Sequence, residues 1–375
     1  MRLDPESGSL TRFRPERGPA VNPDSGTAAA HRYRILMTAD LNHFPVPPLR
    51  YGGAERAVAV FGEALSERGH IVDLIAKSGS RRFNGELYTP PGPSDGLLSR
   101  AFCKAWYQPL SLWAARHADI VHCHSRTDYP VAIYRTEIPM VIHFHNEPSQ
   151  EHVSWILRHR SRHIRLVAIS RSQIEHIAQK EFFEVVHSVP PIDPFPFQER
   201  PQTPPYLVYL GRVNHDKGAD IAVQVARRAG LPLKIVGPVR DEPGNEAFFR
   251  EKIEPYLGPD CVHLGEVTEE EKLRILAGAT ALIFPIRWRE PMGIVMIESL
   301  ACGTPVVVAN RASAPELVTH GKTGFLCEEL EDFVGAVARI GTISRLACRR
   351  EAETRFGFPE MIRKVEAVYG DATAA

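Results

Sequence analysis

Short β-branched runs alternate with helical stretches along most of the chain, and they do so in two series. The first series starts at Arg34 with RILMTA and continues through GAERAVAVFGEALSERG, IVDLIA, DIVHCH, MVIHFH, RLVAIS and EVVHSV. The second starts at Tyr206 with YLVYLG and continues through ADIAVQVARRAG, LKIVG, CVHLGEV, ALIFPI and PVVVAN. Strands that alternate with helices form parallel sheets covered by helices. The pattern therefore predicts two doubly wound α/β domains.

The length of 375 residues agrees with two cores, because single cores seldom grow beyond about 250–300 residues. The segment PPIDPFPFQERPQTPP separates the two series, and its prolines forbid helix continuation and interior strand pairing. We expect a first domain over 31–193, a proline-rich linker over 194–205 and a second domain over 206–357. An amphipathic helix over 359–370 follows. The first 30 residues are rich in Pro, Gly, Ser and charge, which predicts a disordered tail over 1–30.

The composition excludes several classes of protein. Lysine and arginine number 45, as do aspartate and glutamate, so the chain lacks the positive field that nucleic-acid binders use. The six cysteines are scattered without a C-x-x-C pair, which indicates neither a disulfide framework nor a zinc knuckle. No apolar run approaches the roughly 18 residues of a spanning helix, and the first residues lack a signal-peptide core. We expect a cytoplasmic protein that binds no nucleic acid.

One basic stretch bears on membrane contact. WILRHRSRHIRL, residues 155–166, combines arginines, histidines and apolar residues as a membrane-surface helix does. The alternative is an ordinary helix that covers the sheet and has a basic solvent face. Peripheral contact with the inner membrane surface through 155–166 therefore stays an open alternative.

Two glutamates flank an apolar run in WREPMGIVMIESLACGTPVV. The proline and glycine after Glu290 interrupt any helix, so Glu290 should lie in a loop and the helix should start near Met292 or Gly293. A helix start attracts anions such as phosphate. Glu290 and Glu298 lie roughly 10 Å apart on such a helix, about the span from sugar to ribose in a nucleotide diphosphate sugar. Each carboxylate could then hold a pair of hydroxyls, unless the two simply complement the helix dipole and face solvent.

Two cations lie in LGRVNHDKGAD, where a strand ends and the next helix begins. Arg212 follows Gly211 at the strand end, and Lys217 precedes Gly218 at the helix start. Ligands bind at the carboxyl edge of parallel sheets, and an arginine with a lysine can neutralise a diphosphate leaving group without a metal. Surface charges in a turn are the alternative.

Glycines and histidines mark the first domain. Gly52 and Gly53 follow its first strand as a backbone cradle for a phosphate or sugar, but the G-x-G-x-x-G fingerprint of nicotinamide dehydrogenases is missing. Four histidines lie at strand ends, each pair on one face: His122, His124, His143 and His145. A metal site is conceivable there, but carboxylate or cysteine partners at ligand spacing are absent. We expect polar contact with a sugar and no metal.

Together these motifs resemble family 4 of the retaining glycosyltransferases, whose GT-B fold has two facing Rossmann-like domains with a cleft between them. The likeness runs from about His31 to Tyr369. Glu290 to Glu298 looks like the family's E-x7-E signature, followed by SLACGTPVV, and LGRVNHDKG is similar to its G-R-x4-K-G motif. VIHFH resembles the V-x-T-x-H strand end, and YGGAE the glycine-rich acceptor loop. PPID departs from the usual N-G-I-D before the linker.

The resemblance implies roles for these residues. Arg212 and Lys217 would bind the donor diphosphate, Glu290 the transferred sugar and Glu298 the ribose, with His145 near the sugar. The implied catalytic set is Glu290, His145, Arg212 and Lys217. The implied donor-binding set is Gly211, Arg212, Lys217, Gly237, Glu290, Gly293, Ile294, Val295 and Glu298, with Gly52 and Gly53 in the acceptor loop. The helix over 359–370 would return to the first domain.

The sequence thus predicts a retaining, metal-independent glycosyltransferase of carbohydrate biosynthesis that needs no cofactor. It would move a sugar from a nucleoside diphosphate sugar, such as a UDP or GDP sugar, to an acceptor hydroxyl. The acceptor class stays open among small molecules, glycans and lipid-linked acceptors. Two alternatives remain: a catalytically inactive GT-B partner that binds sugar nucleotides, and a GT-B epimerase or phosphorylase.

Overall fold

The computed structural model describes residues 2–3, 10–11, 31–41, 44–48, 53–89, 97–125, 130–189, 192 and 194–375. The chain divides into two compact units, Met1–Arg32 and Tyr33–Ala375. In the first unit, β1 (Arg2–Leu3) pairs antiparallel with β2 (Leu10–Thr11). The rest of the predicted disordered tail over 1–30 lies outside the described residues, as do Gly52 and residues 190, 191 and 193 before the linker.

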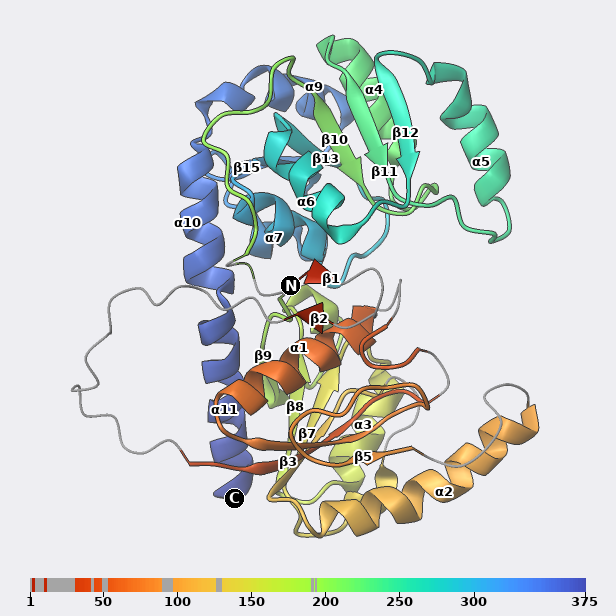
Figure 1. Ribbon diagram of the computed structural model, residues 1–375, viewed down its shortest axis with the longest axis vertical. Coiled ribbons are helices and arrows are strands. Elements are labelled where there is room, and N and C mark those ends of the chain that lie inside the picture. The colour runs from red at the N-terminus through yellow and green to blue at the C-terminus, as the bar shows by residue number, and fades with distance from the viewer. Residues whose placement is uncertain are drawn as a thin grey trace, which may run out of the picture. The chain divides into compact units, whose positions relative to one another are not determined.

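A parallel sheet of seven strands begins the second unit (Figure 1). Its order is β5-β4-β3-β6-β7-β8-β9. The strands are β3 (Arg34–Thr38), β4 (Ile71–Ile75), β5 (Leu87–Tyr88), β6 (Ile120–Cys123), β7 (Met140–Phe144), β8 (Ile164–Ala168) and β9 (Phe183–Val185). Successive strand residues face opposite sides of the sheet. Ile35 therefore belongs to the hydrophobic core that contains Phe61, and Leu36 to the separate core on the other face that contains Tyr107. Helices accordingly cover both faces, α1 (Gly53–Glu67) on one and α2 (Leu97–Ala115) with α3 (Gln150–His159) on the other.

A second parallel sheet has six strands in the order β12-β11-β10-β13-β14-β15. They are β10 (Leu207–Leu210), β11 (Leu233–Val236), β12 (Cys261–Gly265), β13 (Ala281–Phe284), β14 (Val306–Ala309) and β15 (Gly324–Cys327). Its helices are α4 (Ala219–Ala229), α5 (Asn245–Lys252), α6 (Glu269–Gly278), α7 (Ile294–Ala301), α8 (Ala314–Leu317), α9 (Leu330–Ala338) and α10 (Arg345–Phe356). Short 3-10 turns are η1 (Val131–Ile133), η2 (Ser172–Ile174), η3 (Lys180–Phe182), η4 (Glu254–Tyr256) and η5 (Ile340–Thr342).

The strand order reverses at one point in each sheet, between β3 and β6 and between β10 and β13. The connections that leave these neighbouring strands in opposite directions open a crevice at the carboxyl edge of the sheet, where ligands bind in such folds. The prediction of two doubly wound α/β halves is confirmed, and the switch points tell where a site should lie.

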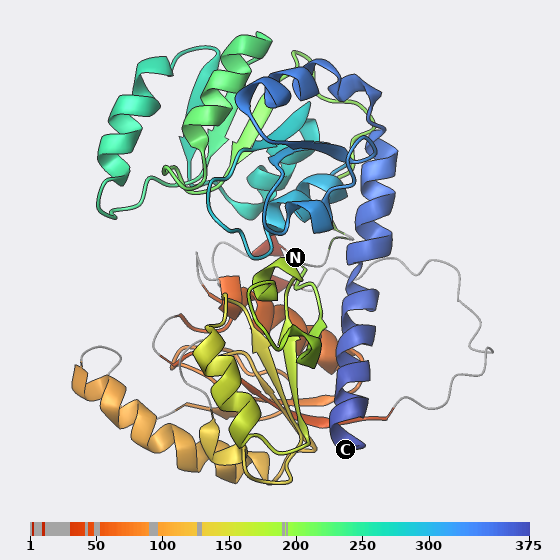
Figure 2. The same ribbon diagram turned by 180° about the vertical axis from the view of Figure 1, so that it is seen from behind.

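The last helix, α11 (Phe358–Thr373), runs along the first sheet (Figures 1 and 2). It packs against β6, β7, β8 and α1. Its Glu366 accepts hydrogen bonds from the Arg68 guanidinium at 2.9 and 2.6 Å and lies 3.1 Å from His70 Nε2. The helix is three residues longer at its C-terminal end than the predicted span of 359–370.

The basic stretch 155–166 is not one helix, so the interpretation of it as a continuous membrane-surface helix is wrong. α3 ends at His159, and Ile164 already belongs to β8. The helix buries Val153 and Ile156 against the sheet, which is the behaviour of an ordinary covering helix. Among the described residues, no helix has the length and apolar character needed to cross a membrane.

Candidate active site

The structure brings Lys217 and Glu290 together at the carboxyl edge of the second sheet. The Lys217 ammonium pairs with Glu290 Oε2, and the Trp288 indole N–H donates to the same oxygen at 2.9 Å. The ammonium also lies 4.6 Å from the centre of the Trp288 ring. Both charged side chains are only 13% exposed, so this is a partly desolvated ion pair rather than a surface one. Lys217 is therefore not the exposed surface charge in a turn that the alternative assumed.

Close backbone packing positions the Lys217 loop. Gly218 caps the start of α4 with a left-handed φ of 72°, and a Cβ there would lie 2.1 Å from the Pro285 carbonyl oxygen. Asn214 Oδ1 accepts the Lys217 backbone N–H at 3.0 Å. Only glycine fits between the two segments, and the loop therefore holds Lys217 against the segment that follows β13.

A second close approach joins Gly211 and Gly237. At Gly237 φ is 140°, and a Cβ would lie 2.0 Å from the Gly211 carbonyl oxygen. The Gly237 N–H donates to Gly265 O at 2.8 Å. The backbones after β10 and β11 thus touch at the edge where the donor-binding residues were predicted.

Arg212 lies beside this contact but is paired elsewhere. Its guanidinium donates to the Glu242 carboxylate at 3.2 and 3.3 Å and is 27% exposed. Tyr209 fixes its backbone, since the phenol O–H donates to Arg212 O at 2.7 Å. Among the described contacts, Arg212 and Lys217 therefore share an edge of the sheet without sharing a partner.

The predicted helix start is confirmed. α7 begins at Ile294, directly after Gly293, whose φ is 62°. Ile294 and Val295 form its first turn, and the Glu290 side chain lies next to Gly293, since a Cβ at Gly293 would be 3.3 Å from Glu290 Cγ. Glu290 lies in the preceding loop, so a carboxylate and an ammonium meet beside the free N–H groups of the helix.

Glu298 is buried, which excludes the alternative of a solvated helix residue. It is 4% exposed, and its Oε1 accepts a hydrogen bond from the Lys272 ammonium at 2.8 Å. Lys272 belongs to α6 and was not predicted as a site residue. Trp288 was not predicted either, although it stands two residues before Glu290.

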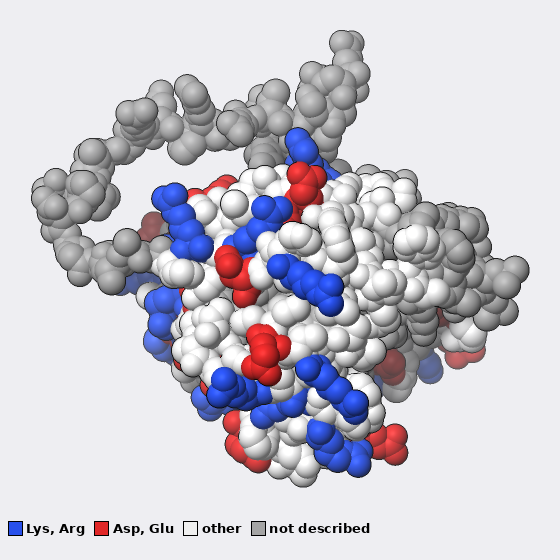
Figure 3. Space-filling view, turned by 90° about the horizontal axis from the view of Figure 1, so that it is seen from below, with Lys and Arg blue, Asp and Glu red and all other residues white. Residues whose placement is uncertain are grey.

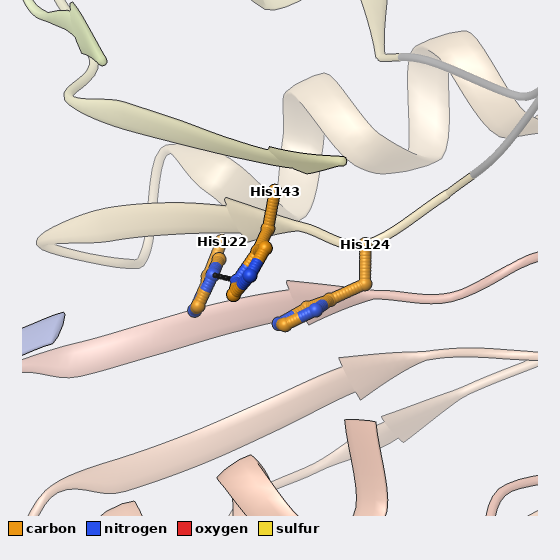
Figure 4. Close-up of side chains that lie close together, drawn as sticks. All are labelled: His122, His124 and His143. Atoms are coloured by element: carbon orange, nitrogen blue, oxygen red, sulfur yellow. Dashed lines mark hydrogen bonds between the residues drawn. The ribbon is translucent and has the colours of Figure 1, made fainter. Parts of the chain in front are cut away.

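Three of the four strand-end histidines form a stack in the first domain (Figure 4). His122, His124 and His143 are at most 1% exposed, so the expectation that they contact a sugar is wrong for these three. Interplanar angles are 10° for His122 with His143, 30° for His124 with His143 and 38° for His122 with His124. Phe61 of α1 packs on all three rings. The fold puts them on the face that α1 and α11 cover.

The same three rings offer nitrogen atoms within 4.8 Å of one another, a spacing open to a metal ion. However, His122 Nε2 and His143 Nδ1 already bond each other at 3.3 Å, and His122 Nδ1 bonds Tyr369 Oη at 2.7 Å. Near-parallel rings direct their in-plane lone pairs side by side, whereas a tetrahedral ion requires them to converge. Burial lowers the pKa of His122 to about 3 and holds those of His124 and His143 well below the usual range. The arrangement is that of neutral imidazoles in a core.

His145 is the exception, being half-buried at the end of the stack. Its Nε2 lies 2.8 Å from His124 Nδ1, and its ring stacks on His143 with centres 4.8 Å apart. Gly53 begins α1 on the neighbouring connection, and Gly52 lies outside the described residues. The stack thus orients one partly exposed imidazole at the carboxyl edge of the first sheet.

Known families match both halves of the chain. Residues 51–187 match Glycosyltransferase Family 4, and residues 193–354 match the family described as Glycosyl transferases group 1. A glycogen synthase of Mycobacterium tuberculosis is 26% identical over 364 residues, covering 83% of this chain and 86% of that protein.

Two solved structures share the fold. Sucrose-phosphate synthase of Thermosynechococcus elongatus has a TM-score of 0.72 at 16% identity and covers 91% of this chain and 99% of that one. Anabaena HepE in complex with UDP-glucose has a TM-score of 0.67 at 16% identity, with 90% and 99% covered.

The two parallel sheets and the matched families define a glycosyltransferase of the GT-B type. The chain belongs to glycosyltransferase family 4, and the predictions of fold class, family and enzyme class are confirmed.

Proposed function

We propose that the enzyme moves a sugar from a nucleoside diphosphate sugar to an acceptor hydroxyl with retention of anomeric configuration. The observation that carries the proposal is the desolvated Lys217–Glu290 pair beside the first turn of α7. A cation suited to phosphate, a carboxylate suited to sugar hydroxyls and the backbone N–H groups of a helix start lie close together there, which supports the proposal. Anabaena HepE, which shares the fold, was crystallised with UDP-glucose, and this supports a donor of that class.

The leaving diphosphate needs compensation as the glycosidic bond breaks. Glycosyl transfer passes through an oxocarbenium-like state, so negative charge grows on the leaving phosphate. Lys217, Arg212 and the start of α7 supply positive potential at that edge. Arg212 is partly exposed and held by Glu242, so it can exchange that carboxylate for phosphate oxygens. We therefore propose transfer without a metal ion or other cofactor.

Retention requires either a nucleophilic carboxylate or attack from the leaving-group side. Lys217 and Trp288 both bind Glu290 Oε2, and this partial neutralisation of the carboxylate charge weakens Glu290 as a nucleophile. We propose front-side attack, in which a donor phosphate oxygen takes the acceptor proton and Glu290 binds the transferred sugar. Glu298 would hold the ribose, and Gly211, Gly237, Gly293, Ile294 and Val295 would let the donor approach the backbone.

The first domain would supply the acceptor side. His145 is positioned by its bond to His124, and its partly exposed ring would contact the transferred sugar from the cleft. Gly53, at the start of α1, would line the acceptor loop. The proposal is compatible with small-molecule, glycan and lipid-linked acceptors alike.

We place the enzyme in the cytoplasm, with peripheral membrane contact as a separate test. Trp155 is 38% exposed, and Arg158 and Arg162 of the same stretch are exposed too, so 155–166 has side chains that could contact a membrane surface. Basic and acidic side chains are interspersed on the face of the molecule in Figure 3, which weakens attraction to anionic lipid there. Sedimentation with anionic vesicles, compared between the native chain and Trp155→Ala, would decide it.

The donor class is tested by thermal unfolding with UDP, GDP and ADP in turn, with EDTA throughout. A nucleotide at a hundred times its Kd adds about 2.7 kcal/mol to the unfolding free energy. One of the three should raise the midpoint, and the anomeric coupling in the product of the matching sugar nucleotide should show retention. Failure of all three to raise it would overturn the proposed donor class.

A further inference from the structure

Lys272 of α6 reaches across to Glu298 of α7 and forms a desolvated ion pair. Its ammonium lies 2.8 Å from Glu298 Oε1, and the side chains are 14% and 5% exposed. Glu269 also accepts from this ammonium at 2.7 Å but is 51% exposed. Arg56 of α1 approaches Glu269 at 3.3 Å, with both side chains about half exposed, so that outer contact contributes little. The Lys272–Glu298 bond is the buried end of this chain of charges.

The pair holds Lys272 in its charged form. Burial by itself would lower the pKa of Lys272, but Glu298 and Glu269 more than offset it, so the pKa stands above its ordinary value. An unpaired carboxylate at the position of Glu298 would be costly, because water reaches little of it. Lys272 therefore makes a charged acceptor tolerable at a buried place on α7.

The geometry leaves half of the carboxylate available. Lys272 binds Oε1, whereas Oε2 has no hydrogen-bond partner among the described residues and is not sealed from solvent. A carboxylate held by one oxygen keeps a fixed orientation for the other, which can accept two hydroxyl groups. Glycosidic or phosphate oxygens carry no proton to donate, so a pair of neighbouring hydroxyls suits this position.

We propose that Lys272 is the positioning residue of the ribose site, an inference that rests on the proposed function. It fixes Oε1 of Glu298 so that Oε2 accepts hydrogen bonds from the vicinal hydroxyls of the donor ribose. The ligand class is a ribonucleoside diphosphate with its 2′ and 3′ hydroxyls intact. Lys272 thereby sets how strongly the enzyme prefers a ribonucleotide to a deoxyribonucleotide.

The test compares affinities for a ribonucleotide and its 2′,3′-dideoxy analogue by calorimetry. UDP is the first probe, with GDP and ADP in parallel. The native enzyme should bind the ribonucleotide at least about 10-fold more tightly than the dideoxy form, because hydrogen bonds to a charged group discriminate strongly. Lys272→Met should reduce this ratio to below about threefold, and Lys272→Arg should keep it.

Controls separate positioning from mere support of α6 and α7. Lys252→Met, at an exposed position on α5, should leave the ratio unchanged. Combining Lys272→Met with Glu298→Gln should weaken ribonucleotide binding no more than the stronger single change, since the two act as a unit. If Lys272→Met lowers the unfolding midpoint but keeps the native ratio, the positioning role is overturned. Should Lys272→Met fail to fold, loss of the ratio in Lys272→Gln supports the role and its retention overturns it.

The donor class and the positioning role of Lys272 can be tested separately. If the native enzyme binds none of UDP, GDP and ADP, the proposed donor class is wrong, and the role of Lys272 falls with it. If it binds one of them with an intact ratio in both Lys272→Met and Lys272→Gln, only the inference about Lys272 is wrong.

Discussion

The Arg287 guanidinium donates to both carboxylate oxygens of Asp220, at 2.8 and 2.7 Å. The same guanidinium donates to the His215 carbonyl at 2.7 Å. Since Lys217 lies between His215 and Asp220 and Glu290 follows Arg287, this clamp fixes the two segments that carry the Lys217–Glu290 pair. The side chains are only 27% and 13% exposed, so the bidentate pair is shielded from competing water.

Replacing Arg287 by lysine should therefore impair the site more than the fold. A lysine keeps the charge but cannot donate the parallel pair of hydrogen bonds. We expect kcat/KM to fall at least about 10-fold, with a loss of about 1–2 kcal/mol in unfolding free energy. Arg274→Lys is the control, because that side chain is 74% exposed. Equal kinetics for both variants would show that the clamp does not position the active site.

Lys217 itself should be needed for turnover. Lys217→Met removes the ammonium that would stabilise the leaving phosphate, and we expect kcat to fall about 100-fold or more. The fall in kcat would be measured from steady-state rates with the sugar derivative of whichever nucleotide raises the unfolding midpoint. Lys252→Met provides a matched loss of one exposed charge and should keep the native rate. Native turnover in Lys217→Met would remove this residue from the catalytic set.

The contact between Gly211 and Gly237 predicts a large cost for a single methyl group. Gly237→Ala puts a Cβ 2.0 Å from the Gly211 carbonyl oxygen at a φ of 140°, so the backbone has to shift. We expect a loss of about 2 kcal/mol or more in the free energy of unfolding by urea. Gly258→Ala is the matched control, since its Cβ would meet nothing within 4 Å. A similar small effect of both changes would mean that the backbone after β11 yields easily.

The local signals in the sequence explain what could be predicted. The start of α7 could be predicted because Pro291 and Gly293, which interrupt a helical pattern, stand directly before it in the sequence. The strand runs were readable because a parallel sheet buries both faces of each strand. The ion pair of Lys272 with Glu298 joins residues 26 apart on two helices, and no local pattern specifies which lysine turns inward.

The two wrong interpretations have the same origin. α3 ends at His159 and the chain turns into β8, but residues 155–166 contain no helix breaker such as glycine or proline. His122 and His143 stand near strand ends, where site residues are common. The face that carries them is nevertheless covered by α1 and by α11, which comes from the far end of the chain. The pairing of Ile164 with Met140 in the sheet decided the first case, and the packing of α11 from the far end of the chain decided the second.

Tyr369 should anchor α11 to the first sheet. Its phenol oxygen lies 2.7 Å from His122 Nδ1, and both groups are fully buried. Tyr369→Phe keeps the ring but leaves the imidazole nitrogen without a partner, so we expect a loss of about 1–3 kcal/mol in unfolding free energy. Urea unfolding of Tyr369→Phe and of Tyr256→Phe, an exposed control, would measure the difference. A native midpoint in Tyr369→Phe would show that the bond adds nothing to the packing.

The buried histidine stack should make the fold sensitive to mild acid. Burial lowers the pKa of His122 to about 3 and those of His124 and His143 well below 6.5. Below about pH 6.5 these three rings therefore stay neutral in the folded protein, whereas the same histidines take up protons in the unfolded chain. Their contribution to stability is complete above about pH 6.5 and is lost as the pH falls below that value. Each ring can cost up to about 1.4 kcal/mol per pH unit.

Urea unfolding at pH 7.5, 6.5 and 5.5 would measure this dependence on pH. The free energy of unfolding should change little between the first two values and fall steeply between the last two. His143→Asn removes one titrating ring and should flatten the lower part of the curve by about a third, since three rings share the effect. His215→Asn should leave the slope as it is, because the His215 side chain is 68% exposed. Equal slopes in the native chain and His143→Asn would mean that the imidazoles take up protons in the folded state, and the stack would then have to open to water without unfolding.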